Sequence, residues 1–87
     1  MEIGSVFLIL DQSLETNRET LVLIPGGDFV DAFILDARPG HLAIEVAGVP
    51  FEARPWRDGD ARPPLHPGKM EATTAWTIYG IEGHTRL

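Results

Sequence analysis

The sequence contains no cysteine, which excludes disulfide bonds, thiolate nucleophiles and cysteine metal sites. It is also poor in positive charge: seven basic residues, of which Lys69 is the single lysine, stand against 13 acidic residues, and the formal net charge is -6. Binding to nucleic acid needs clustered Lys and Arg side chains that neutralise phosphates. The composition therefore disfavours a protein that binds DNA or RNA directly.

Long apolar runs are scarce as well. The apolar run near the N-terminus, Val6 to Leu10, follows Glu2 with no basic residue before it. Such a run is too short and wrongly flanked for a signal peptide or a membrane span. We therefore expect a cytoplasmic protein with no membrane association, which agrees with the lack of cysteine.

The residues that are present favour one folded domain over residues 1–87. The chain is 44% hydrophobic and 23% charged, as in globular domains, and 87 residues are too few for two independent cores. Residues 1–53 carry nine acidic and two basic side chains, a net charge of -7, whereas residues 54–87 carry four acidic and five basic ones, a net charge of +1. One part of the surface should therefore be acidic.

Alternating apolar and polar residues predict a hairpin in the middle of the chain. A two-residue turn at Ala47-Gly48 places all apolar side chains on one face and requires Ala47 to adopt a left-handed conformation. Pro50 lacks an N–H, so the second strand is either an edge strand or unpaired at that position. The register pairs Val46 with Val49, Ile44 with Phe51, and Leu42 with Ala53.

The preceding run, residues 29–37, extends this sheet through a Pro-Gly turn at residues 38–41. The predicted register pairs Ala37 with Leu42, Leu35 with Ile44, and Phe33 with Val46. Asp31 then falls on the apolar face. This conflict indicates either a buried carboxyl with a raised pKa or a bulge or strand end that returns Asp31 to water.

The remaining segments complete an all-β chain. Apolar runs at residues 6–10 and 21–24 predict strands covered on both faces, and alternation over residues 70–80 predicts a last strand with Trp76 and Ile78 on one side. Residues 54–69 hold four of the seven prolines and predict a long loop. About six strands with short connections predict a small antiparallel barrel or sandwich.

The sequence shows no motif for catalysis, phosphate binding or metal binding. His41, His66 and His84 lie in separate segments without the spacing of metal ligands, and neither serine lies in a Gly-x-Ser-x-Gly turn. We therefore expect a protein that is not an enzyme and that has neither a metal nor a cofactor.

The long loop is the main candidate for binding a partner or a ligand. It gathers side chains that suit anionic or aromatic groups and protein interfaces, namely Arg54, Trp56, Arg57, Arg62 and His66. The alternative is a structural role. In that case Trp56 folds back as a lid on the barrel end, and the arginines offset the acidic part of the chain.

Two functions follow from these patterns. The first is a non-enzymatic interaction module that docks onto a partner protein as an inhibitor or an assembly component, with help from strand addition at a sheet edge. A basic partner surface would meet an acidic surface that includes Asp28, Asp31, Asp36 and Glu45, although such charge also serves solubility. The second is a barrel that binds an anionic small molecule through the Arg and Trp loop.

Self-assembly is a third interpretation. In the predicted register Val30 and Ile34 lie on the outer face of their strand, where an apolar stripe would be covered by a second copy of the chain. A homo-oligomer is therefore among the predicted assemblies.

Overall fold

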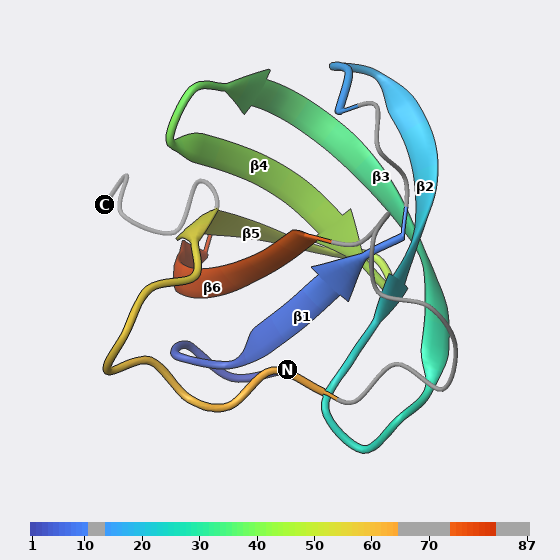
Figure 1. Cartoon of the computed structure of the whole chain (residues 1–87). Coiled ribbons are helices and arrows are strands. Elements are labelled where there is room, and N and C mark those ends of the chain that lie inside the picture. The colour runs from blue at the N-terminus through green and yellow to red at the C-terminus, as the bar shows by residue number, and fades with distance from the viewer. Residues whose placement is uncertain (11–13, 65–73, 82–87) are drawn as a thin grey trace.

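The computed structural model describes residues 1–10, 14–64 and 74–81, and its regular elements in these ranges are six β-strands (Figure 1). They are β1 (Val6–Ile9), β2 (Arg18–Leu23), β3 (Phe29–Arg38), β4 (His41–Val46), β5 (Val49–Pro55) and β6 (Thr74–Ile81). No helix in these ranges is long and apolar enough to cross a membrane. The predicted all-β fold is confirmed.

The strands form one closed antiparallel barrel in chain order, and β1 closes it by pairing with β6. The structure therefore decides between the two predicted architectures in favour of the barrel. Every strand has a neighbour on both sides (Figure 1). Strand addition at a free sheet edge, which the docking hypothesis invoked, therefore finds no strand without two neighbours among these six, although β2 pairs with β1 only at Val22 and Leu23.

The β4–β5 hairpin has the predicted register and turn. Leu42 pairs with Ala53, Ile44 with Phe51 and Val46 with Val49. Ala47 adopts a left-handed conformation with φ 51°, as the tight turn requires. Pro50 pairs with Glu45 on β4, while the pairing of β5 with β6 begins only at Phe51, so the missing N–H of Pro50 falls outside that ladder.

A bulge in β3 makes two of the three predicted β3–β4 pairs wrong. Ala37 pairs with Leu42 as expected, but the register shifts by one between Ile34 and Asp36, so that Ile34 faces Ile44 and Phe33 faces Glu45. The extra residue is Leu35. Bulges increase the local twist and bend of a strand, which a barrel of six strands needs in order to close.

The bulge reverses the predicted faces of the first half of β3. Ile34 is fully buried in the core and Ala32 is nearly so, whereas Phe33 and Leu35 are half-buried. Asp31 is exposed, so the bulge resolves the conflict in favour of return to water. The predicted outer stripe of Val30 and Ile34 is wrong, because Val30 packs against the core and Ile34 belongs to it.

The core fills the barrel interior with aliphatic and aromatic side chains from all six strands. β1 is buried along its whole length, as predicted. β2 departs from the prediction, because it begins at Arg18 and because Leu21 is 40% exposed. The core residues are Phe7, Ile9, Val22, Ala32, Ile34, Leu42, Ile44, Val46, Phe51, Ala53, Trp76 and Ile78.

The predicted loop is shorter at its start, because β5 continues to Pro55 and Arg54 is therefore a strand residue. The structure describes the following segment to residue 64, and His66 lies outside the described residues. The predicted last strand appears as β6, with Trp76 and Ile78 buried. Residues 70–73 of that prediction lie outside the described part of the chain.

Candidate functional site

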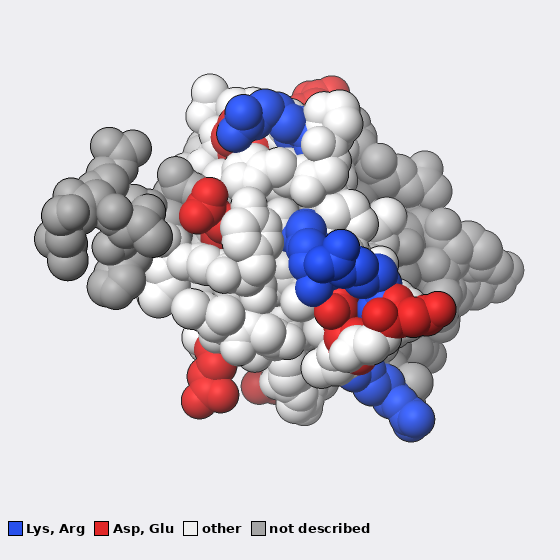
Figure 2. All heavy atoms as spheres, turned by 90° about the vertical axis from the view of Figure 1, so that its left-hand side faces the viewer, with Lys and Arg blue, Asp and Glu red and all other residues white. Residues whose placement is uncertain are grey.

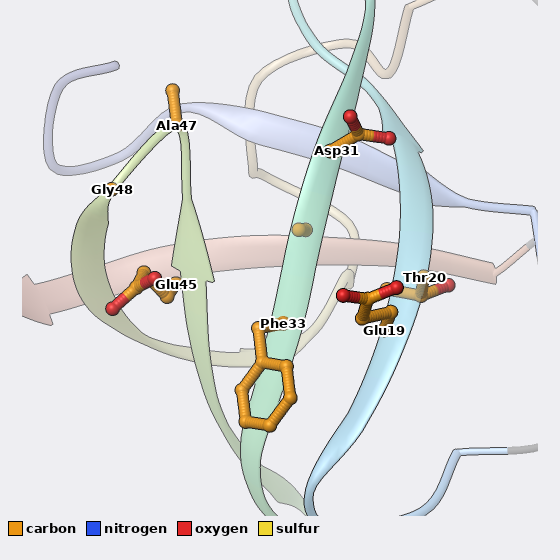
Figure 3. Close-up of a pocket in the computed structure, with 8 residues that line it drawn as sticks. Glu19, Thr20, Asp31, Phe33, Glu45, Ala47 and Gly48 are labelled. Carbon is orange, nitrogen blue, oxygen red and sulfur yellow. The ribbon is translucent and has the colours of Figure 1, made fainter.

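A groove with a volume of ≈ 460 Å³ crosses the outer face of β2, β3 and β4 and ends at the β4–β5 turn (Figure 3). Three of its lining side chains are carboxylates, and we call it the acidic groove. It is lined by Glu19, Thr20, Asp31, Ala32, Phe33, Glu45, Ala47 and Gly48.

Strand pairing builds the acidic groove. Phe33 pairs with Glu19 on β2 and with Glu45 on β4, so an aromatic side chain is flanked by an acidic residue on each side. Figure 3 shows Phe33 on β3 between Glu45 and Glu19, with Asp31 further along the same strand. The β3 bulge makes this arrangement, because without the shift Phe33 would face Val46 in the interior.

The electrostatics of the groove favour a cation. Among the described residues that line it, none is Lys or Arg, and the nearby Arg18 is paired with Glu15 at 3.2 Å. Carboxylates grouped on a concave surface raise the local concentration of positive groups. Leu21 pairs with Asp31 and is 40% exposed, which adds apolar surface beside the groove.

The segment that follows β5 is tied to the barrel by Asp60. The Asp60 carboxylate accepts two hydrogen bonds of 2.8 Å from the Arg54 guanidinium, one of 2.8 Å from the Thr77 hydroxyl and one of 3.0 Å from the Arg57 backbone N–H. The side chains of Arg54 and Asp60 are 24% and 12% exposed. We call these contacts the Asp60 staple.

The staple shifts the pKa of both charged partners in the direction that favours their ionised forms. Hydrogen bonding from Arg54, and next from Thr77, holds the pKa of the Asp60 carboxyl well below its usual range, although partial burial opposes this effect. The hydrogen bond with Asp60 likewise raises the pKa of Arg54. The sequence suggested that the Arg54 guanidinium binds a ligand. In the structure this guanidinium binds Asp60 and so stabilises the segment that follows β5.

Trp56 is also held by contacts within the protein. Its indole Nε1 donates to the Ala61 carbonyl at 2.8 Å, and its backbone N–H donates to the Ala75 carbonyl at 3.0 Å. Arg57 and Arg62, by contrast, are exposed. On the face shown in Figure 2, Arg atoms lie directly beside Asp and Glu atoms, so the surface there is mixed rather than uniformly basic.

The predicted acidic residues do not form one surface. Asp31 and Glu45 line the acidic groove, whereas Asp28 is exposed in the β2–β3 turn and Asp36 is paired with Arg38 at 2.8 Å. The groove also contains Glu19 and Phe33, which the sequence did not single out. A correct prediction of the β2–β3 register would have placed Glu19 beside Phe33.

Neither a cluster of metal ligands in the described part of the chain nor a similar protein was found that would point to a function. Among residues 1–10, 14–64 and 74–81, no group of three or more His, Asp or Glu side chains is placed to hold a metal ion. No protein-family model matches the chain, and neither the curated proteins nor the solved structures contain a match.

Proposed function

We propose that this protein is a non-enzymatic interaction module that binds a basic segment of a partner protein in the acidic groove. The observation that carries the proposal is the row Glu19, Phe33 and Glu45 across three paired strands, with Asp31 beside it. Carboxylates attract Lys and Arg side chains, and the Phe33 ring offers a face on which a cationic group stacks.

The shape of the groove favours a peptide segment over a compact small molecule. The groove follows the surface of three strands and ends at an exposed turn, Ala47-Gly48. Phe29 is 46% exposed and lies on the same strand as Asp31 and Phe33. A partner segment with alternating basic and apolar side chains would contact the carboxylates and this apolar border together.

Through this contact the protein would act as an inhibitor that covers a basic surface of its partner, or as an assembly component. Charge of this kind steers association and makes it sensitive to salt. Arg57 and Arg62 are exposed. That they bind a second part of the same partner, or an anionic ligand, stays a prediction.

Binding of a Lys- and Arg-rich peptide, followed by nuclear magnetic resonance titration, tests the proposal. We expect chemical-shift changes centred on Glu19, Phe33 and Glu45, and affinity that falls as salt rises from 50 to 500 mM (about tenfold or more). A double variant, Glu19→Gln with Glu45→Gln, should weaken binding about 2- to 30-fold, since exposed ion pairs contribute roughly 0.2–1 kcal/mol each and more when they act together.

The matched control is the double variant Asp28→Asn with Asp58→Asn, which removes the same charge from exposed positions outside the groove. We expect it to change the affinity for the peptide only slightly. Equal weakening by both double variants would show that overall charge rather than the groove binds the peptide, and the proposal would then be wrong.

A further inference from the structure

A second hollow, with a volume of ≈ 230 Å³, lies beside the β3–β4 turn. Most of its lining is apolar. Leu42 and Trp76 belong to the core, and Leu14 and Ala37 pack against it. We call this hollow the barrel-end pocket; it is lined by Leu14, Ala37, Arg38, Pro39, His41, Leu42 and Trp76.

Hydrogen bonds fix the apolar walls of the barrel-end pocket. The Ala37 N–H donates to the Thr16 hydroxyl at 3.0 Å, and the Asn17 N–H donates to the Ile34 carbonyl at 2.7 Å. These two bonds hold the segment that carries Leu14 against β3. Because the walls are already positioned, a ligand loses little free energy in ordering them.

The Trp76 indole presents carbon surface to the pocket. Its polar atom, Nε1, donates to the Thr74 hydroxyl at 2.9 Å and is therefore already satisfied. Trp76 is 7% exposed, which places the ring at the boundary between the core and the pocket. A flat apolar group is the natural neighbour of such a ring.

The two polar side chains that line the pocket are Arg38 and His41. Arg38 uses its Nε to bind Asp36 at 2.8 Å, which leaves the other N–H groups of the guanidinium for a further acceptor. The His41 Nδ1 lies 2.7 Å from the Tyr79 hydroxyl, and this contact fixes the ring. In the tautomer in which this hydroxyl donates to Nδ1, the proton of the imidazole is on Nε2, which is then a hydrogen-bond donor. No Asp or Glu lines the pocket within the described residues.

We propose that the barrel-end pocket binds a small carboxylic acid with a single flat apolar ring. The ring packs against Leu42 and Trp76, and the carboxylate accepts hydrogen bonds from Arg38 and His41. Drug-sized ligands occupy pockets of about 300–1,000 Å³, so a volume of ≈ 230 Å³ limits the ligand to one ring. The proposal is independent of peptide binding in the acidic groove, which shares no residue with this pocket.

Titration of the isotope-labelled full chain with benzoate tests the proposal. Benzyl alcohol serves as a probe with the ring but no charge, and acetate as a probe with the charge but no ring. We expect benzoate to shift the Trp76 indole resonance and the Ala37 and His41 amides in a saturable way, with a dissociation constant on the order of 1 mM. Both other probes should bind at least about tenfold more weakly, because each lacks one half of the recognition.

Two variants sharpen the result. Arg38→Gln should weaken benzoate about tenfold and leave benzyl alcohol unchanged, whereas Arg62→Gln, an exposed arginine outside the pocket, should change neither. Each of three outcomes would overturn the proposal. The first is the absence of a saturable shift with benzoate up to about 20 mM, which is about twentyfold above the expected dissociation constant. The second is equal shifts with acetate or benzyl alcohol, and the third is an unchanged benzoate affinity in Arg38→Gln. Arg38→Gln should leave the affinity for the basic peptide unchanged, because Arg38 does not line the acidic groove. The test of the pocket is therefore separate from the test of the groove.

Discussion

Replacing Ile34 and Leu35 by alanine, one at a time, tests the β3 bulge. The bulge places Ile34 in the core at 0% exposure and leaves Leu35 half-buried. Without it, Leu35 would face Ile44 and Ile34 would lie outside. The two variants remove similar numbers of carbon atoms from neighbouring positions, so their relative cost reports which side chain is inside.

The expected magnitudes differ clearly. Truncating a buried isoleucine to alanine costs about 2–5 kcal/mol, through lost transfer free energy and the cavity that remains. In a domain of this size each kcal/mol lowers Tm by roughly 4–8 °C, so Ile34→Ala at about 3 kcal/mol should lower Tm by roughly 12–24 °C. Leu35→Ala should cost about 1 kcal/mol or less.

Thermal unfolding followed by circular dichroism, with urea unfolding as a second measure, gives both values. Ile34→Val is the control for packing, because it keeps β-branching and removes one methyl group at a cost of about 0.5–1.5 kcal/mol. If Leu35→Ala proves more destabilising than Ile34→Ala, the bulge is absent and the placement of Phe33 in the acidic groove fails with it.

Three further predictions use the same unfolding measurements. Ile44→Asp should abolish folding by burying an unpaired charge, whereas Glu45→Lys should keep the barrel folded and weaken binding of the basic peptide; equal tolerance of both by circular dichroism would show that the faces of β4 are reversed. Because the folded pKa of Asp60 is lowered, its contribution to stability is complete at neutral pH and is lost progressively as the pH falls below about 4. Asp60→Asn should therefore reduce the acid sensitivity of Tm between about pH 4 and 2 and expose residues 56–64 to proteolysis, and an unchanged acid profile would contradict the Asp60 staple. Ala47→Gly should stabilise the protein by roughly 0.5–1 kcal/mol in urea unfolding, since glycine adopts the left-handed turn conformation without strain; a loss of stability would mean that the turn is not left-handed at this residue.

The β4–β5 hairpin was predictable because several signals agree on one register. The alternation on both strands, the Ala47-Gly48 turn and the position of Pro50 all point to the same pairing. β3 was harder, because residues 32–35 are all apolar. A shift by one residue therefore leaves an apolar side chain facing inward in either case, and the geometry of barrel closure rather than the pattern decides.

The candidate site was predictable only in part, for the same reason. Asp31 and Glu45 were recognised as acidic surface residues, but Glu19 and Phe33 join them only through pairings that span three strands. The Asp60 staple was missed because Asp60 joins Arg54, six residues away on β5, to Thr77, which is 17 residues away on β6. Local patterns carry no information on such contacts.

Closure of the barrel through the pairing of β1 with β6 has a consequence for how the chain folds. β1 gains its second neighbour only when β6 docks, so the slow step joins the two strands that are farthest apart in the sequence. We therefore expect folding times of milliseconds to seconds, about the range of β-barrels. Until then β1 and β5 expose unpaired backbone that another chain can bind. Refolding yield should therefore fall with protein concentration, even though each strand of the completed barrel pairs with two neighbours.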